Sequence, residues 1–297
     1  IEEAGIHSGD SAAVLPPYRV SAELQDEMRE IGRRLAIRLG VVGLMNIQFA
    51  VYQGQVYVLE VNPRASRTVP FIAKAVGVPL VRLAAQLMVG KSLEELGFTE
   101  EPPVPGVFVK APVFPFRRFP GVDPVLGPEM KSTGEVMGHS DSFGNAFAKA
   151  WLGAGHRLPL KGSAFLSVHD QDKEALLPIA LRLRQLGFRL CSTHGTASFL
   201  KEQGLEVERV RKVHEQRPHV ADLLINGEID LVVNTPLGRE SQKDDMVIRQ
   251  TALRYDIPCI TTLSGARAAV EGIAAMRKDG LSARSLQSLH RPEPVSG

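Results

Sequence analysis

The strongest constraint on the fold is a change in sequence pattern after residue 162. From there, short β-rich runs alternate with longer segments of helical spacing, and the runs are GSAFLSV (162–168), GFRLCST (187–193), DLVVNTP (230–236) and IPCITTL (257–263). Strands that alternate with helices predict a parallel sheet with helices on both faces. Ligands of such sheets bind beyond the C-terminal ends of the strands. The polar residues at those ends are therefore candidate ligands.

Hydroxyl groups, backbone amides and lysines gather at these expected strand ends, which indicates a phosphate-binding site. The stretch THGTA (193–197) opens a helix, and a helix N-terminus favours anions. The candidate residues are Ser167, Lys173, Thr193, Gly195, Thr196, Lys212, Asn234 and Thr235. The alternative for each residue taken alone is a turn, because Ser and Thr at strand ends form turns more often than ligand sites.

The first half of the chain has a different pattern. Ser21 can cap a helix that Gly40 ends, and its apolar positions recur at helical spacing: Leu24, Met28, Ile31 and Leu35. The runs NIQFAVY (46–52) and QVYVLEVN (55–62) alternate around Gln53-Gly54 and predict an antiparallel hairpin. Residues 70–88 return to helical spacing.

Three segments of other composition follow. Residues 102–138 are rich in Pro and Gly, which predicts an ordered loop region with short regular elements. A helix is expected around residues 142–152, and GAGHRLPLKG (153–162) is typical of a linker between domains. The last residues, RPEPVSG (291–297), are expected to be disordered.

Glu60 and Asn62 are two residues apart on an expected strand, so their side chains share a face. A carboxylate in a row with Val56 and Val58 is costly unless it is paired or bound to a metal. Mg²⁺ accepts carboxylate and amide oxygens together with phosphates. On spacing alone, a solvated strand face with structural salt bridges is an equally good interpretation.

Composition limits the remaining classes. The 297 residues suggest about two domains, and the formal charge of +2 leaves no large basic field for nucleic acid. Cys191 and Cys259 form neither a disulfide framework nor a metal-ligand spacing, which favours a reducing, cytoplasmic location. The sequence contains no apolar run long enough to span a bilayer and no N-terminal secretion signal. We therefore expect neither a nucleic-acid nor a membrane partner.

Longer stretches of the chain resemble the large subunits of carbamoyl-phosphate synthases. The resemblance rests on IEEAGIHSGDSA (1–12), GLMNIQFAVYQGQVYVLEVNPRASRTVPF (43–71), FPGVDPVLGPEMKSTGEVMG (119–138), THGTA, and KVHEQRPH (212–219). It implies an α/β protein with two parts. Residues 1–155 would be the α+β C-terminal part of a carbamate-phosphorylating ATP-grasp domain. Residues 156–297 would be a parallel-sheet, Rossmann-like domain of the methylglyoxal-synthase-like type with an allosteric role.

The resemblance also assigns roles to residues. It places the metal ions, Mg²⁺ or Mn²⁺, on Gln48, Glu60 and Asn62, with K⁺ as a further candidate. Arg64 and Arg67 would line the phosphate end as catalytic residues. Together with Gln48 and Glu60, the nucleotide-binding positions would be Gly5, Ile6, His7 and Ser8.

The reaction implied is that of an ATP-dependent ligase that makes carbamoyl phosphate from bicarbonate, ammonia released from glutamine, and ATP. A glutamine amidotransferase small subunit would be the partner, and the full-length protein is expected to be an oligomer that serves arginine and pyrimidine synthesis. The chain opens with Ile1 inside a motif. We therefore expect that the beginning of the first domain is missing and that the chain alone does not catalyse.

The resemblance names UMP as the nucleotide effector of the second domain and does not favour ornithine. Ornithine-activated members resemble this chain at Glu2, Asp10 and Thr261 but carry glutamate at the position of Ala111 and tyrosine at that of Cys259. Two alternatives remain. One is a stand-alone nucleotide-binding regulatory protein. The other is a methylglyoxal synthase, which Arg217 and Thr235 argue against, because they stand where that enzyme needs carboxylates.

The metal assignment makes a demand on the hairpin. A two-residue loop at Gln53-Gly54 would pair Tyr52 with Gln55 and hence Gln48 with Leu59, leaving Gln48 on the face opposite Glu60. A loop with one more residue and a left-handed Gly54 brings Gln48 and Glu60 to one face. We therefore predict the odd-length loop.

Overall fold

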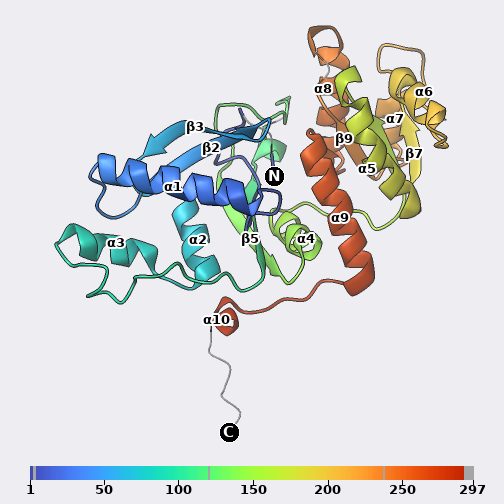
Figure 1. Cartoon of the computed structure of the whole chain (residues 1–297). Helices are drawn as coiled ribbons and strands as arrows, with labels where there is room; N and C mark the ends of the chain where they lie inside the picture. The colour runs from blue at the N-terminus through green and yellow to red at the C-terminus, as the bar shows by residue number, and fades with distance from the viewer. Residues whose placement is uncertain (3–4, 120, 237, 291–297) are drawn as a thin grey trace. The chain divides into compact units, whose positions relative to one another are not determined.

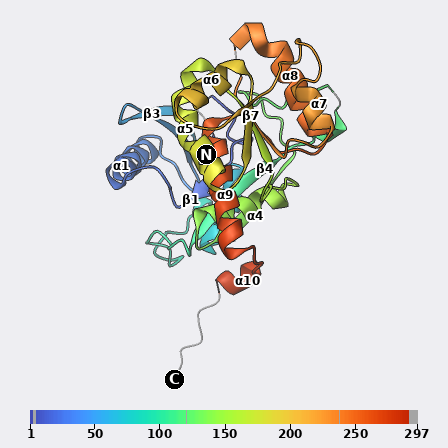
Figure 2. The same cartoon turned by 90° about the vertical axis from the view of Figure 1, so that its right-hand side faces the viewer.

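The computed structural model describes residues 1–2, 5–119, 121–236 and 238–290, and the side chains of residues 238–242 are not described (Figures 1 and 2). The expected disorder of residues 291–297 lies outside the described residues. The chain forms two compact units. The hairpin unit contains residues 14–107 and the segment from 282 onward, and the sheet unit contains residues 1–13 and 108–281.

The hairpin unit begins with α1 (Ala22–Arg38), and its N-cap is the predicted Ser21, whose side chain accepts a hydrogen bond from the Leu24 amide. Strands β2 (Asn46–Tyr52) and β3 (Gln55–Asn62) form the predicted antiparallel hairpin, and α1 packs against it. The helical spacing after residue 70 becomes two helices, α2 (Thr68–Val76) and α3 (Leu80–Met88), because Gly77 is left-handed and ends α2. The short α10 (Leu286–Leu289) follows near the end.

The sheet unit contains the Pro- and Gly-rich region, which is more regular than expected. Strands β4 (Val107–Val113) and β5 (Gly134–Ser140) pair there, and β1 (Ala13–Leu15), which runs across the boundary of the two units in the sequence, completes a three-stranded sheet in the order β1-β4-β5. A single turn of 3₁₀ helix, η1 (Phe116–Arg118), follows β4. Helix α4 (Phe143–Gly153) confirms the helix expected around residues 142–152, and Ser142 caps it.

The second sheet has the predicted parallel topology. Its strands lie in the order β10-β9-β6-β7-β8, and all neighbouring strands are parallel. The predicted runs form β6 (Ser163–Ser167), β7 (Arg189–Ser192), β9 (Leu231–Asn234) and β10 (Cys259–Ile260). The two-residue β8 (Glu208–Arg209) at one edge was not predicted, because it is too short for a periodic pattern. The chain leaves β6 toward β7 and later returns to its other side as β9, so the strand order reverses at β6.

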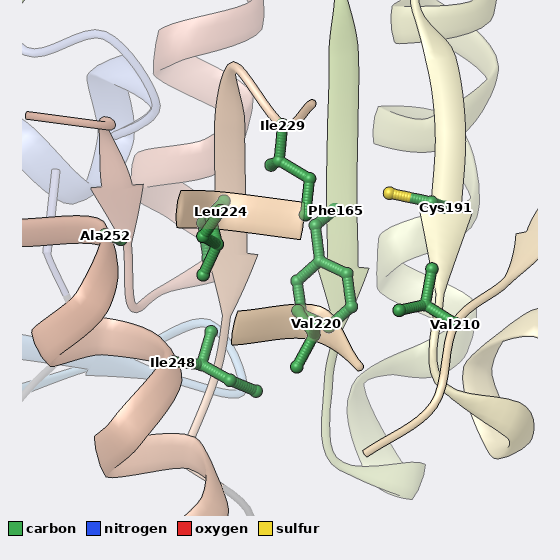
Figure 3. Packing of buried hydrophobic residues seen from close by; sticks show 9 residues of the cluster. Phe165, Cys191, Val210, Val220, Leu224, Ile229, Ile248 and Ala252 are labelled. Atoms are coloured by element: carbon green, nitrogen blue, oxygen red, sulfur yellow. The ribbon is translucent and has the colours of Figure 1, made fainter. Parts of the chain in front are cut away.

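Helices cover both faces of this sheet. They are η2 (Asp170–Asp172), α5 (Lys173–Gln185), α6 (His194–Glu202), α7 (Val220–Ile225), α8 (Gly238–Arg254) and α9 (Leu263–Asp279). Figure 3 shows the packing on one face, where Phe165 of β6 meets Val220 and Leu224 of α7 and Ile248 of α8 completes the cluster. Ala164 and Leu166 alternate with Phe165 and are also fully buried, so β6 is the central strand of the core.

The two sheets share no strand, and the three-stranded one ends at Ser140 before the parallel one begins at Ser163. Helix α4 packs against α9 within the sheet unit. The domain boundary near residue 155 stays a prediction. Among the described residues no single helix is long and apolar enough to cross a membrane, and only α2 with α3, as a bent pair, meets the length and composition criteria.

Candidate functional sites

The hairpin places its polar side chains on one face. Gln48 pairs directly with Glu60, and Asn46 pairs with Asn62, so these four side chains point to the same side of the two strands. On the opposite face, Ile47 approaches Gly32 of α1, since a Cβ at that glycine would lie 3.6 Å from the Ile47 Cδ1 atom. Helix α1 therefore covers the apolar face and leaves the carboxylate and amide row away from it.

The predicted odd-length loop is wrong, although the shared face that it was meant to explain is present. Tyr52 pairs with Gln55, so the loop has two residues, and both Gln53 (φ 50°) and Gly54 (φ 75°) are left-handed. This is the geometry of a type I′ turn, whose twist matches that of the strands. The register shifts between Gln48 and Phe49 instead, where a β-bulge leaves Leu59 as the extra residue.

The candidate residues of the hairpin are accessible to a ligand. Glu60 is exposed and Asn62 is partly buried, and the Asn62 Nδ2 atom donates a 3.0 Å hydrogen bond to Glu60 Oε1. Arg64 and Arg67 follow the strand and are exposed, and Arg64 Nη1 donates to the Ala65 carbonyl oxygen at 3.1 Å. The polar face of the hairpin offers the carboxylate of Glu60 and the amides of Asn46, Gln48 and Asn62. All four groups carry the hard oxygen donors that Mg²⁺ and Mn²⁺ prefer.

No group of three or more His, Cys, Asp or Glu side chains gathers as a metal site among the residues that the structure describes. The hairpin set is not such a group, because only Glu60 in it belongs to those four types. A metal ion there would need phosphate or water oxygens to complete its coordination.

The candidate nucleotide segment Gly5–Ser8 belongs to the sheet unit. The His7 amide donates to the Gly127 carbonyl oxygen at 2.8 Å, and Lys110 Nζ donates to the Ser8 carbonyl oxygen at 3.2 Å. Lys110 is almost fully buried, and this burial lowers its pKa although Glu135 and Asp10 oppose the shift. The segment is thus tied to the protein through its backbone.

The second candidate site is a pocket of about 540 Å³ at the C-terminal ends of β6 and β7, where the strand order reverses. That volume is in the range of small-molecule sites. Six of the eight predicted residues line it: Ser167, Lys173, Thr193, Gly195, Thr196 and Lys212. The hydroxyl groups of Ser167 and Thr193 lie 3.3 Å apart, and the Val168 amide donates to Thr196 Oγ1 at 3.5 Å.

Cationic and amide donors meet at one side of this pocket. Helix α6 begins there after Thr193, whose side chain makes no capping hydrogen bond, so the first amides of the helix face the pocket without that partner. The Lys173 ammonium group lies over Gly195, where an added Cβ would stand 3.5 Å from Nζ. The same ammonium group pairs with Asp170 at 2.8 Å, and this pairing lowers the pKa of Asp170.

The other two predicted residues, Asn234 and Thr235, do not line the pocket. Asn234 is fully buried at the end of β9, and its Nδ2 atom donates to the Ser167 carbonyl oxygen and to Asp245. Thr235 donates to Asp172 at 2.8 Å and accepts from the His169 amide at 3.1 Å. Both support the residues around the pocket, and their predicted contact with an effector stays a prediction.

Comparison with known sequences assigns the two halves of the chain. Residues 2–96 match the family model for the carbamoyl-phosphate synthase L chain, ATP binding domain, and residues 175–261 match that for an MGS-like domain. Carbamoyl phosphate synthase large chains are 53% identical over 98% of this chain in Gemmatimonas aurantiaca and 51% identical over 98% in Archaeoglobus fulgidus, covering 26% and 27% of those proteins.

The chain is homologous to the C-terminal segment of the carbamoyl phosphate synthase large chain. It spans about a quarter of the length of these curated relatives. Among solved structures, a methylglyoxal synthase from Elizabethkingia anophelis is 20% identical, with a TM-score of 0.31 over 47% of this chain and 97% of that one, which is too weak a likeness to support an argument.

A second cavity, with a volume of about 120 Å³, lies within the sheet unit. All five positions compared for ornithine line it: Glu2, Asp10, Ala111, Cys259 and Thr261. Asp10 is fully buried and accepts from the Lys131 and Ser132 amides. Burial raises the pKa of Cys259 to about 12, so its thiol is neutral. The expectation that ornithine is not an effector stays a prediction.

Several residues around the pocket at the ends of β6 and β7 were not singled out from the sequence. They are Val168, His169, Asp170, Lys243 and Asp244, and Asp244 pairs with His214. Asp170 precedes Lys173 by one helical turn, so this spacing was available as a signal for an ion pair. Lys243 and Asp244 lie on α8, far along the chain, and only the tertiary structure brings them to the pocket.

Proposed function

We propose that the hairpin supplies metal and ATP ligands for the phosphorylation of carbamate in an ATP-dependent ligase that makes carbamoyl phosphate. The observation that carries the proposal is the pairing of Gln48 with Glu60 on the face that also bears Asn62. These three residues would hold a metal ion, which would supply positive charge to neutralise the phosphates of ATP. Arg64 and Arg67 would bind the phosphoryl group with their planar guanidinium groups. The segment Gly5–Ser8 would lie against the nucleotide.

The proposal extends to the whole protein, of which this chain would be one part. Bicarbonate and ammonia would be the other substrates, and a glutamine amidotransferase subunit would release the ammonia. The product would serve arginine and pyrimidine synthesis in the cytoplasm. By itself the chain would bind ligands without completing the reaction.

We propose that the pocket at the ends of β6 and β7 binds the phosphate of a regulatory nucleotide, with UMP as the first candidate. Lys173 and Lys212 supply positive charge, and the N-terminus of α6 supplies backbone donors. The hydroxyl groups of Ser167, Thr193 and Thr196 can accept or donate as the ligand requires. The pocket is therefore suited to an anion with several oxygen atoms.

The test is the thermal stability of the 297-residue chain with and without UMP. A ligand that binds only the folded state adds about 2.7 kcal/mol of stability at one hundred times its dissociation constant. We expect UMP and inorganic phosphate to raise the melting temperature and uridine, which lacks the phosphate, to leave it unchanged. An equal effect of uridine, or none from UMP at millimolar concentration, would contradict the pocket assignment.

The methylglyoxal synthase alternative is disfavoured by the carboxylates that line the pocket. Asp170 pairs with Lys173, which lowers the pKa of Asp170 and makes it a weaker base, and Asp244 is within hydrogen-bonding distance of His214. A general base must be able to take a proton from the substrate. Incubation with dihydroxyacetone phosphate should therefore release no methylglyoxal.

A further inference from the structure

Arg249 of α8 is the largest fully buried side chain among the described residues, with 2% of its surface exposed. All three types of guanidinium nitrogen are used. Nε and Nη2 donate to the two carboxylate oxygens of Asp123 at 2.8 and 2.6 Å, and Nη1 donates to Asn234 Oδ1 at 2.8 Å. A buried cation with a planar fork thus joins two segments that are far apart in the sequence.

One end of this connection is the floor of the phosphate pocket. Asn234 accepts from Arg249 and donates its Nδ2 hydrogen to the Ser167 carbonyl oxygen at 3.3 Å. Ser167 ends β6, lines the pocket and lies 3.3 Å from Thr193 through its hydroxyl group. A displacement of Ser167 by a ligand therefore acts on Arg249 through one intervening side chain, that of Asn234.

The other end is the loop that holds the nucleotide segment. Asp123 Oδ1 accepts from the Val125 amide at 3.2 Å, and Gly127, two residues further on, accepts from the His7 amide at 2.8 Å. The Lys131 side chain donates to the Val125 carbonyl oxygen, while its amide donates to Asp10. Burial acts to raise the pKa of Asp123, but Arg249, the Val125 amide and Lys131 together lower it, which favours the charged carboxylate.

We propose that Arg249 is a positioning residue that couples occupancy of the phosphate pocket to the placement of the segment Gly5–Ser8. The inference rests on the proposed function, because it takes an anionic effector as the occupant of the pocket. The coupling runs from Ser167 through Asn234 and Arg249 to Asp123 and its loop, all of which lie within the sheet unit. A rigid bidentate pair transmits a shift of either partner, whereas a flexible single contact absorbs it.

The experiment follows amide hydrogen exchange of His7 and Val125 in the whole chain, with UMP binding measured in parallel. These two amides donate to Gly127 and to Asp123, so their exchange reports directly on the loop. Saturating UMP should change their exchange rates by about fivefold or more, the lower range of allosteric couplings. In Asp123→Asn the change should fall below about twofold while the affinity for UMP stays within about threefold.

Two further variants test whether the response depends on the paired guanidinium group of Arg249. Arg249→Lys keeps the positive charge but lacks the fork, and it should lose the response even if Asp123→Asn fails to fold. Gln250→Ala is the matched control, because Gln250 ties the same helix to the same loop through the Gly121 carbonyl oxygen without reaching Asn234. It should keep the full response.

The outcomes separate the inference from the function on which it rests. UMP binding without any change at His7 and Val125 in the unaltered chain would overturn the inference and leave the pocket assignment intact. An undiminished response in Arg249→Lys or Asp123→Asn would also overturn it. If the chain binds neither UMP nor inorganic phosphate, the pocket assignment and the inference both fall. Loss of the response in Gln250→Ala would show general loosening of the loop and would count against a role specific to Arg249.

Discussion

The hairpin and the C-terminal ends of the parallel strands hold their candidate ligand-binding residues in different ways. On the hairpin, Glu60 is exposed and is positioned by strand register, with one hydrogen bond from Asn62. At the C-terminal ends of β6 and β7, Ser167 and Thr193 are 2% and 6% exposed and lie within hydrogen-bonding distance of each other. The first arrangement leaves a charge ready for a cation, and the second is already formed before a ligand arrives. Substitutions should therefore affect ligand binding and activity to different extents at the two sites.

The largest effect is expected at the hairpin, where one carboxylate carries the charge. In the full-length protein, Glu60→Gln should lower ATP-dependent formation of carbamoyl phosphate by about 100-fold or more, since a catalytic metal contributes several kcal/mol. Steady-state assays at varied Mg²⁺ concentration measure it. The control is Gln55→Ala on the same strand, which should keep its activity. A Glu60→Gln enzyme with ordinary activity would remove the metal assignment.

A single substitution in the pocket at the ends of β6 and β7 should have a smaller effect on ligand binding, because several donors would share the phosphate. Lys173→Ala is expected to weaken UMP binding by about 10- to 100-fold, the worth of one hydrogen bond to a charged group. Calorimetric titration of the chain measures the change. Lys201→Ala removes an exposed lysine of α6 that does not line the pocket and should bind UMP normally. Equal losses in both variants would indicate a nonspecific charge effect.

The cavity lined by Ala111 and Cys259 offers a test by gain of function. Ornithine should have no effect on the unaltered full-length protein, and Ala111→Glu with Cys259→Tyr should create a response. Each restored group is worth about 1.5–3 kcal/mol, so the double variant should bind ornithine far more tightly than either single one. Activity assays over an ornithine series test this. Strong activation of the unaltered protein would refute it.

The smallest effect concerns the turn of the hairpin. Gly54 has φ of 75° and no neighbouring atom near an added Cβ, so Gly54→Ala acts through backbone strain alone. We expect a loss of about 1 kcal/mol in the free energy of unfolding, measured in urea. Gly134→Ala adds a Cβ to open space at a glycine without positive φ and should cost less. No difference between the two would argue against the left-handed turn.

The sequence predicted the parts of both sites that depend on local periodicity. Glu60 and Asn62 share a face because they are two residues apart on one strand. Ser167 and Thr193 come together because they lie at the C-terminal ends of neighbouring parallel strands. The bulge at Leu59 was missed because the prediction assumed an unbroken ladder from the turn to Gln48, and a bulge leaves no periodic signal in the sequence. The pairing of Asp123 with Arg249, 126 residues apart, has no local signal at all. Whether Asn234 faces the pocket or lies beneath it depends on side-chain packing, which periodicity does not encode.

The bulge has a consequence for chain length. Between the turn and the bulge, partners follow one register, and beyond Leu59 they follow another, so the hairpin consists of two ladders in series. Omitting Leu59 would merge them into one regular ladder and still leave Gln48 opposite Glu60. Related chains could therefore differ by one residue at this point without turning a ligand to the other face. The same position would accept a deletion more readily than any neighbour between it and Asn62, where a single lost residue reverses the ligand row.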